Sequence, residues 1–374
     1  MIPDIDVLTV QIEKKRVGKM ALSNNQRCVF EYDPEWLKEG FSISPIHLPL
    51  ERGLFTAKSD PFSGLFGVFN DSLPDGWGNL IIHRWLREQG VKPETLSWIE
   101  RLAIVGSSGM GALCYEPEIK EAQKKQTYKQ NKSLDYYASE VEKILNEEPV
   151  ESLDELVEKA GSSGGARPKV LMELDGKAWL IKFRAEGDPK DIGNLEYHYS
   201  QTAKEAGIVM AETRLFEGKY FGTERFDRKN GERIHMITAS GLLHASHRYP
   251  SLDYTDLMKA TFILTRSMVE VKKVYRLMSF NVLTHNRDDH AKNFSFLYRD
   301  GEWVFAPAYD LVYSHGFRGN HSTMVLGDGA PDHKKILKAG EEAGLSRAVC
   351  KKIFEEVEEA TLELVSLIKK RWEI

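Results

Sequence analysis

The segment THNRDDHAKNFSFLYRDGEWVFAPAYD, residues 284–310, joins a cluster of polar side chains to two strand-like stretches around Asp300-Gly301. An Asp-Gly pair between apolar stretches is among the strongest short-range signals for a β-hairpin with a two-residue turn. In that register Arg299 faces Glu302, and counting outward places Asn293 opposite Ala308. Asp310 should then return to within two residues of Asn293. The segment therefore predicts a carboxylate and a carboxamide together at one end of a hairpin.

The polar cluster has the spacing of the catalytic loop of protein kinases, H-R-D-x-x-x-x-N. Arg287, Asp288 and Asn293 match it, and Asn286 stands where the histidine would be. In such a loop the aspartate accepts the proton of the attacking hydroxyl, while the asparagine and a further aspartate, here Asp310, bind Mg²⁺. The other interpretation is a polar loop at a helix end with Asp310 as a simple helix cap, and three matching residues leave both open.

A glycine-rich segment, GSSGGARPK at residues 161–169, precedes a second predicted hairpin with Asp175-Gly176 at its turn. That register places Lys169 opposite Lys182, and like charges facing each other destabilise a strand pair. Lys182 also lies in an apolar strand, where an unpaired ammonium is costly. A polyphosphate between the lysines, under the backbone N–H groups of the loop, would remove both objections. The loop residues expected to contact it are Ser163, Gly164 and Gly165. A flexible linker with a surface lysine pair is the alternative.

Two further segments carry weaker signals. TERFDR at 223–228 places Glu224 and Phe226 at a strand end. There they could flank the purine of a bound nucleotide or belong to an ordinary strand. GSSGMGA at 106–112 resembles the later glycine-rich segment but has no lysine nearby, so we expect a structural turn there.

The composition is that of a folded protein with more than one domain. The 374 residues, 41% hydrophobic and 29% charged, suit two or three globular domains. Three scattered cysteines argue against a disulfide framework or a zinc ribbon, and the net charge of -5 gives no general attraction for nucleic acid. No basic leader and no apolar run of roughly 18 residues is visible, so we expect a cytoplasmic location.

The pattern along the chain predicts an α+β fold. Strand-like stretches dominate residues 6–32, long helical patterns occupy 254–283 and the last 40 residues or so, and a polar link covers 119–132. We expect a β-rich N-terminal domain at 1–118, a mixed nucleotide-binding lobe at 119–228, and a mostly helical lobe with the catalytic loop at 229–374.

Taken together, the motifs resemble those of the HipA-like serine/threonine kinases, toxins of bacterial toxin–antitoxin systems. The matches are SSGGARPK, WLIKF, NLEYHYSQTAKEAGI, TERFDR, DDHAKNFSF and PAYDLV, in the order of the family. VGKMAL, FEYDPEWL, LPDGWG and MGALCYEP resemble the N-terminal region of the same family. The resemblance implies a protein-kinase-like fold of two lobes, preceded by the β-rich domain.

The resemblance also implies roles for individual residues. Asp288 would be the catalytic base, Asn293 and Asp310 the Mg²⁺ ligands, and Lys182 the contact to the phosphates of ATP. Ser162 would be the autophosphorylation site that inactivates the enzyme when the glycine loop is expelled. Other residues expected at the nucleotide are Lys169, Glu224, Phe226 and His290. Asp289 departs from the pattern, because well-known members have glycine there.

The partners implied by the resemblance are a protein substrate, which could be an aminoacyl-tRNA synthetase, and a small DNA-binding antitoxin of the HipB type. DNA would be contacted only indirectly. We therefore expect an ATP- and Mg²⁺-dependent serine/threonine kinase. One alternative is a kinase fold without catalysis that regulates DNA occupancy together with an antitoxin. Another is a metallophosphoesterase, since Asp288-x-His290 and Gly319-Asn320-His321 match two metal-binding blocks of that class, although its G-D-x-x-D block is missing.

Overall fold

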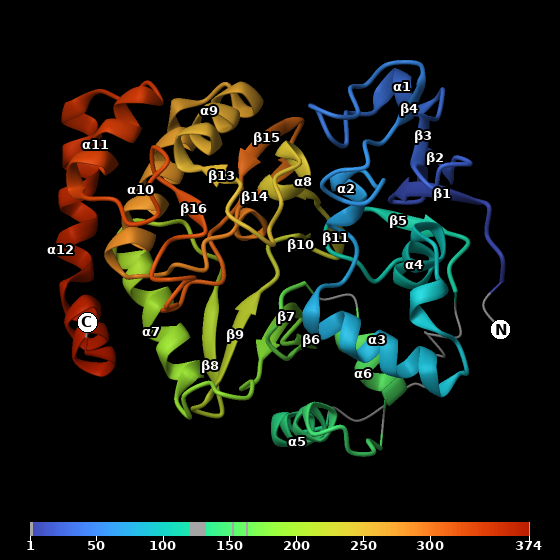
Figure 1. Cartoon of the computed structure of the whole chain (residues 1–374), viewed down its shortest axis with the longest axis horizontal. Coiled ribbons are helices and arrows are strands. Elements are labelled where there is room, and N and C mark those ends of the chain that lie inside the picture. The colour runs from blue at the N-terminus through green and yellow to red at the C-terminus, as the bar shows by residue number, and fades with distance from the viewer. Residues whose placement is uncertain (1–2, 120–131, 152, 162–163, 374) are drawn as a thin grey trace. The chain divides into compact units, whose positions relative to one another are not determined.

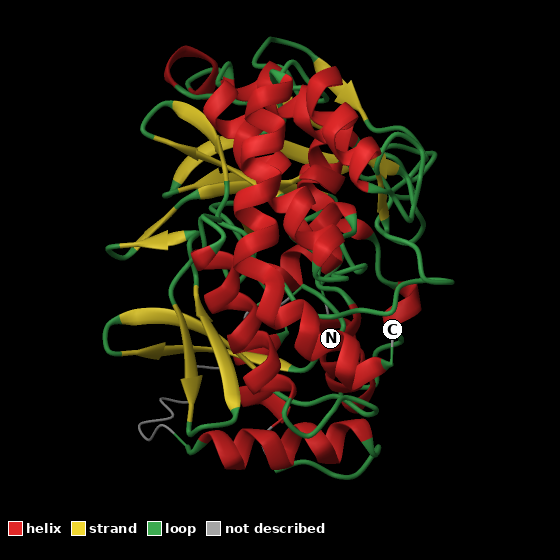
Figure 2. Cartoon of the chain, turned by 90° about the vertical axis from the view of Figure 1, so that its left-hand side faces the viewer, coloured by secondary structure: helices red, strands yellow, loops and turns green. Residues whose placement is uncertain are grey.

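The computed structural model describes residues 3–119, 132–151, 153–161 and 164–373 and divides into two compact units. Unit 1 comprises Met1–Gly193 and Arg214–His235, and unit 2 comprises Asn194–Thr213 and Met236–Ile374. Helices and strands occur in both (Figures 1 and 2), so the α+β class is confirmed. The three expected domains stay a prediction, and most of the polar link at 119–132 lies outside the described residues.

The first sheet of unit 1 has five strands in the order β4-β3-β2-β1-β5. Its strands are β1 (Val7–Ile12), β2 (Lys15–Leu22), β3 (Cys28–Tyr32), β4 (Leu54–Thr56) and β5 (Cys114–Glu116). Alternate side chains of β1 are buried, Leu8, Val10 and Ile12 among them, as expected of a sheet with one covered face. The β-rich start of the chain predicted from the sequence is confirmed.

The helices of unit 1 follow the predicted apolar patterns with one difference. They are α1 (Trp36–Glu39), α2 (Gly67–Asn70), α3 (Gly76–Glu88), η1 (Pro93–Thr95), α4 (Trp98–Val105), α5 (Leu134–Leu145) and α6 (Leu153–Ala160). In α3, Trp77, Ile81 and Trp85 are buried as expected, but Leu80 is 43% exposed. Ile82 is buried in its place, because the covered face of α3 packs against α6.

The second sheet of unit 1 contains the hairpin after the glycine loop, in the order β6-β7-β9-β8. The strands are β6 (Lys169–Leu174), β7 (Lys177–Lys182), β8 (Thr213–Phe216) and β9 (Tyr220–Glu224), followed by a short hairpin of β10 (Arg228–Lys229) and β11 (Glu232–Arg233). Asp175 and Gly176 have φ values of 54° and 73°, the positive values that a type I′ turn requires. The pairing of Lys169 with Lys182 is confirmed.

The two longest helices of unit 2, α10 and α12, pack against each other, and α12 lies at the left edge of Figure 1. The helices are α7 (Ile192–Glu205), α8 (Ala239–Leu243), α9 (Tyr254–Thr265), α10 (Met268–Leu283), η3 (Ala291–Asn293), α11 (His333–Glu342) and α12 (Arg347–Trp372). The predicted helical region 254–283 is two helices, because Arg266 adopts a left-handed conformation, φ 54°, and caps α9.

The second predicted hairpin belongs to the three-stranded sheet β12-β14-β15. Its strands are β12 (His235–Thr238), β14 (Ser295–Arg299) and β15 (Glu302–Phe305), and β13 (Leu252–Asp253) pairs separately with β16 (Thr323–Met324). Arg299 faces Glu302 as predicted. The pairing does not extend to Asn293 and Ala308, because the amide of Asn293 donates to the His290 oxygen and the amide of Ala308 donates to the Val209 oxygen.

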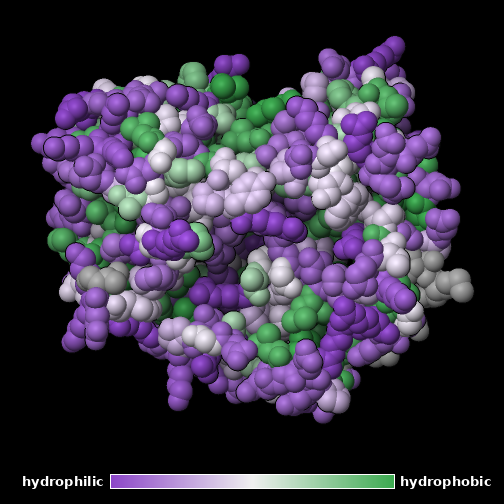
Figure 3. Space-filling model, viewed as in Figure 1, coloured by the Kyte–Doolittle hydropathy of each residue, from purple (hydrophilic) through white to green (hydrophobic). Residues whose placement is uncertain are grey.

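None of the helices in the described part of the chain is long and apolar enough to cross a membrane. The visible face in Figure 3 is mainly hydrophilic, with apolar residues in small separate areas. Cys28, Cys114 and Cys350 are free thiols.

Candidate functional site

The candidate catalytic loop, residues 285–294, connects helix α10 to strand β14 in unit 2. Helix α10 ends at Leu283, and His285 turns the chain out of the helix with φ 54°. Burial and the charge of Arg287 lower the pKa of His285 to about 4. The imidazole is therefore neutral near pH 7, and Nδ1 accepts a hydrogen bond from Arg287 Nη2 at 3.2 Å. The dense polar sequence is thus a connection that leaves the end of a buried helix.

Asp288 lies on the outer side of this loop, with 61% of its side chain exposed. The neighbouring 3₁₀ turn, η3, brings Asn293 back toward it, and Asn293 Nδ2 donates to the backbone oxygen of Asp288 at 2.7 Å. Because the amide nitrogen is used by the loop itself, Oδ1 of Asn293 is the atom that a cation would bind. The two residues of the predicted catalytic pair therefore lie together.

Asp310 lies on the segment that runs along the loop. Tyr309 Oη donates to the backbone oxygen of Lys292 at 2.6 Å, and Ser314 forms a parallel bridge with Asn286. Asp310 itself is held at φ 58°, an uncommon conformation for a residue other than glycine. These contacts hold the segment on either side of Asp310 against the loop. The strand register does not reach that far, so the approach of Asp310 to Asn293 stays a prediction.

The residues around this pair fit a nucleotide-bound Mg²⁺. Mg²⁺ is usually held by one or two protein carboxylates together with phosphate oxygens, which is the kind of donor set that Asp310 and Asn293 offer. His290 Nε2 is 4.0 Å from Asp288 Oδ1, and His290 Nδ1 is buried without a hydrogen-bond partner among the described residues. A buried polar atom of this kind is usually satisfied by a ligand or water.

Asp289 is the functional candidate that the sequence motifs missed. Its side chain is 1% exposed and accepts hydrogen bonds from Tyr254 Oη at 2.7 Å and His321 Nδ1 at 2.9 Å. The sequence contained one signal, the Gly319-Asn320-His321 block, which suggested a metal ligand. In the structure this histidine contacts Asp289, a carboxylate of the candidate catalytic loop.

The predicted phosphate-binding residues lie in unit 1 around the glycine loop, of which residues 164–168 are described. Lys169 is buried, and its ammonium donates to the backbone oxygen of Gly164. The amide of Gly165 donates to Asp75 Oδ2 at 3.2 Å, and Trp77 Nε1 donates to the Lys169 oxygen at 2.9 Å. The beginning of α3 therefore holds the loop. Ser162 and Ser163 lie outside the described residues.

The sheet of unit 1 carries the other predicted nucleotide contacts. Lys182 is half-buried at the end of β7, with its ammonium 5.7 Å from the ring centre of Phe221. Glu224 faces Trp179 across the sheet and accepts a hydrogen bond from Lys177 at 2.9 Å. Phe226 is half-buried in the turn after β9.

The charged residues of TERFDR have a structural role that the sequence did not indicate. Asp227 is buried, and although burial raises its pKa, the charges of Arg225 and Arg228 lower it to about 2. Asp227 accepts from the amide of Gly111 at 2.8 Å, and Arg228 and Arg233 donate to backbone oxygens of the same turn. The expected structural turn at 106–112 is therefore confirmed, and its anchor lies in the segment 225–233.

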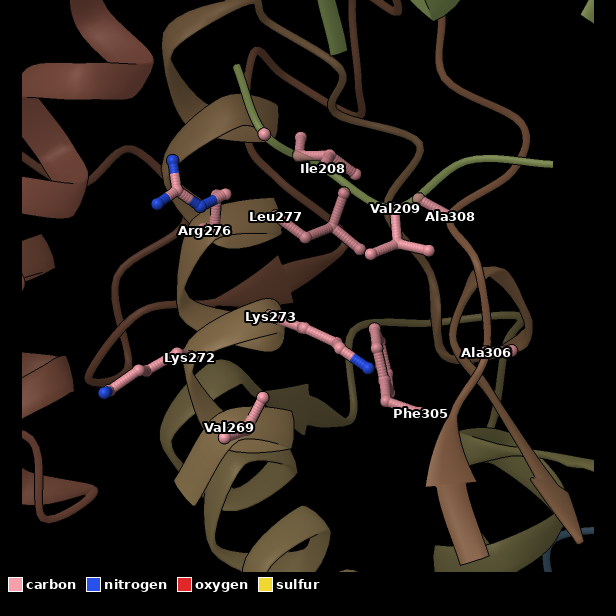
Figure 4. A pocket seen from close by; sticks show the side chains of 11 residues that line it. Ile208, Val209, Val269, Lys272, Lys273, Arg276, Leu277, Phe305, Ala306 and Ala308 are labelled. Carbon is pink, nitrogen blue, oxygen red and sulfur yellow. The ribbon is translucent and has the colours of Figure 1, made fainter. Parts of the chain in front are cut away.

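A pocket of about 250 Å³ in unit 2 is lined by residues outside the predicted set (Figure 4). Ile208, Val209 and Leu277 form part of an apolar wall, and Lys272 and Arg276 lie at its side. Arg276 is already bonded to the Ala206 oxygen and to Glu356. The predicted site residues thus form two sets, one in each unit, and neither includes this pocket.

Two family models match the chain. The HipA-like C-terminal domain matches residues 161–365, and the HipA N-terminal domain matches residues 8–116. Two Sinorhizobium fredii proteins are relatives. "Putative kinase Y4mE" is 26% identical over 91% of this chain and 83% of its own length. "Putative kinase Y4dM" is 21% identical over 87% of this chain and 81% of its own length.

A solved structure supports the same fold. The HipA chain in the Shewanella oneidensis complex of HipA, HipB and operator DNA has a TM-score of 0.69 and 19% identity, covering 96% of this chain and 90% of that one. The likeness shows a shared fold, and the C-terminal family model covers more than half of the sequence. The resemblance of the motifs is confirmed, and the chain belongs to the HipA family.

Proposed function

We propose that the protein transfers the γ-phosphoryl group of ATP, with Mg²⁺, to a serine or threonine of a protein. The observation that carries this proposal is the outward carboxylate of Asp288 beside an Asn293 amide that is oriented by the loop itself. The names of the Sinorhizobium relatives are consistent with a kinase. Such a reaction needs a positioned base and concentrated positive charge, and it needs no covalent enzyme intermediate.

In this proposal the carboxylate of Asp288 accepts the proton of the substrate hydroxyl. Asn293 Oδ1 and Asp310 hold the Mg²⁺, which, when bound, offsets the charge of the phosphates. His290, whose side chain is 24% exposed, lines the nucleotide site.

Residues of unit 1 form a second set that we propose for nucleotide binding. The amides of the glycine loop, including Gly164 and Gly165, and the ammonium groups of Lys169 and Lys182 bind the phosphates. Glu224 and Phe226 flank the adenine.

We further propose that the kinase is the toxin of a toxin–antitoxin pair and acts in the cytoplasm. The related Shewanella HipA was solved with HipB and operator DNA, which supports a small HipB-like antitoxin as partner, with DNA contacted through it. Autophosphorylation of Ser162 would switch the kinase off, and a protein of translation, such as an aminoacyl-tRNA synthetase, is the class of substrate.

The test is incubation with γ-labelled ATP and Mg²⁺, followed by mass mapping of the labelled residues. Asp288→Asn should lower the transfer rate by a factor of about 10² to 10⁴, the usual contribution of a general base, while ATP affinity stays within about threefold. Asp300→Asn is the matched control, because Asp300 is an acid in the adjacent hairpin turn whose left-handed conformation asparagine also adopts.

Three results would contradict the proposal. Transfer by Asp288→Asn at the wild-type rate would remove Asp288 from the role of base. A wild-type chain that binds ATP but never transfers phosphate would instead be a non-catalytic regulator. Hydrolysis of phosphoesters with metal and without ATP would favour the phosphoesterase.

A further inference from the structure

A buried carboxylate adjoins the proposed catalytic base. Both oxygens of Asp289 are used: Oδ2 accepts from Tyr254 Oη at 2.7 Å and from His321 Nδ1 at 2.9 Å. Oδ1 accepts from the backbone amides of Ser322 at 2.8 Å and Thr323 at 3.2 Å. A buried carboxylate costs free energy unless it is satisfied in this way, so its four hydrogen bonds fix the position of the side chain.

Ser322 and Thr323 also hold the loop backbone on each side of Asp288. The oxygen of Arg287 accepts from the amide of Ser322 at 3.2 Å and from its hydroxyl at 3.0 Å. The oxygen of Asp289 accepts from the hydroxyl of Thr323 at 2.5 Å. Strand β16 begins at Thr323 and pairs with β13, so the loop is attached to a strand pair within unit 2.

A chain of hydrogen bonds between buried side chains connects the start of the loop to Asp289. Asn286 Nδ2 donates to Asn281 Oδ1 at 3.0 Å, and Asn281 Nδ2 donates to Tyr254 Oη at 2.9 Å. Tyr254 in turn donates to Asp289. Asn286 and Asp289 therefore both point into unit 2, while Asp288 between them remains exposed.

We propose that Asp289 is a positioning residue for the phosphoryl transfer: through residues 321–323 it fixes the loop backbone so that Asp288 faces the substrate hydroxyl. The inference rests on the proposed function. Asp289 touches no reacting atom in this role. A misplacement of about 1 Å in a catalytic group can cost about 100-fold in rate, so loosening this attachment should slow transfer without weakening nucleotide binding.

The test compares Asp289→Ala with Glu270→Ala in the full chain, using label transfer from ATP. Glu270 is a suitable control because it is also a buried carboxylate of unit 2, accepting from the amide of Phe305 at 2.8 Å and pairing with Lys273. Asp289→Ala should lower kcat about 100-fold with the KM for ATP within about threefold. Glu270→Ala should leave both constants of the folded fraction within about threefold.

Two milder variants keep the test decisive if Asp289→Ala does not fold. Asp289→Asn keeps an oxygen for the amides of Ser322 and Thr323, so it should recover most of the rate lost in the alanine variant. Ser322→Ala removes the hydroxyl bond to the Arg287 oxygen and should lower kcat about tenfold.

The outcomes separate the inference from the function on which it rests. If the wild type transfers phosphate and Asp289→Ala is equally active, the inference alone is overturned. The same holds if Glu270→Ala loses as much activity as Asp289→Ala. If the alanine variant does not fold, full activity of Ser322→Ala overturns it. If the wild type transfers no phosphate, the proposed function fails and the inference fails with it.

Discussion

Replacing His235 should change how the stability of unit 1 depends on pH. The imidazole of His235 is 2% exposed, and Nε2 donates to the backbone oxygen of Ile43 at 2.9 Å. Burial lowers the pKa of His235 to about 4, while the bond to Ile43 acts in the opposite direction. The folded chain therefore keeps this histidine neutral under conditions in which the unfolded chain protonates it.

The sign and the size of the effect follow from the two pKa values. Because the folded pKa, about 4, lies below the ordinary value of 6.5, the stabilisation is complete above pH 6.5 and is lost as the pH falls toward 4. The whole difference corresponds to roughly 3 kcal/mol of unfolding free energy, of which about 2 kcal/mol is lost between pH 7.5 and pH 5.0.

The assay is urea unfolding at pH 7.5 and at pH 5.0, followed by tryptophan fluorescence, since most tryptophans lie in unit 1. The glutamine of His235→Gln can still donate to the Ile43 oxygen but does not titrate. The free energy of unfolding of this variant should therefore fall by about 2 kcal/mol less than that of the wild type between pH 7.5 and pH 5.0. His315→Gln, at an exposed histidine, is the control and should behave as the wild type does. Equal pH dependence in the wild type and His235→Gln would refute the reasoning.

Two further predictions concern the proposed nucleotide and metal residues. Gly165→Ala should raise the KM for ATP about tenfold in initial-rate assays, because Gly165 has φ 82° and a Cβ would lie 2.7 Å from Lys169 Nζ. Gly164→Ala, whose nearest contacts would be 3.5 Å, should change it less than twofold, and equal effects of the two would contradict the expectation. Asp310→Asn should raise the Mg²⁺ concentration for half-maximal transfer at least about tenfold, and an unchanged Mg²⁺ titration would remove Asp310 from the metal site.

The parts of the fold that the sequence predicted are those determined over short distances. Asp175-Gly176 and Asp300-Gly301 set the turn geometry of their hairpins, so the facing of Lys169 and Lys182 could be counted outward from the turn. The count failed beyond Ser295 and Ala306, because the amides of Asn293 and Ala308 donate to His290 and Val209 and not across the hairpin. Hairpin registers are therefore reliable only as far as every residue can supply its backbone hydrogen bond.

The parts that could not be predicted depend on partners distant in sequence. Periodicity alone cannot show that Asp289 points inward while Asp288 points outward, because the direction is set by the amides of residues 322 and 323. The arginines at 228 and 233 likewise hold a turn more than a hundred residues earlier. Such contacts leave no local pattern, and only the order of the motifs suggested that these segments belong to one fold.

The two facing lysines have contacts within the protein that offset their like charges. The sequence favours an anion between Lys169 and the facing Lys182, with a surface lysine pair as the alternative. In the structure the ammonium of Lys169 donates to the Gly164 oxygen, and that of Lys182 lies 5.7 Å from the ring centre of Phe221. These contacts reduce the like-charge cost without a phosphate, so the pair is compatible with one but does not demand it. The proposal of a kinase therefore depends chiefly on the candidate catalytic loop, where Asp288 is exposed between the buried residues Asn286 and Asp289.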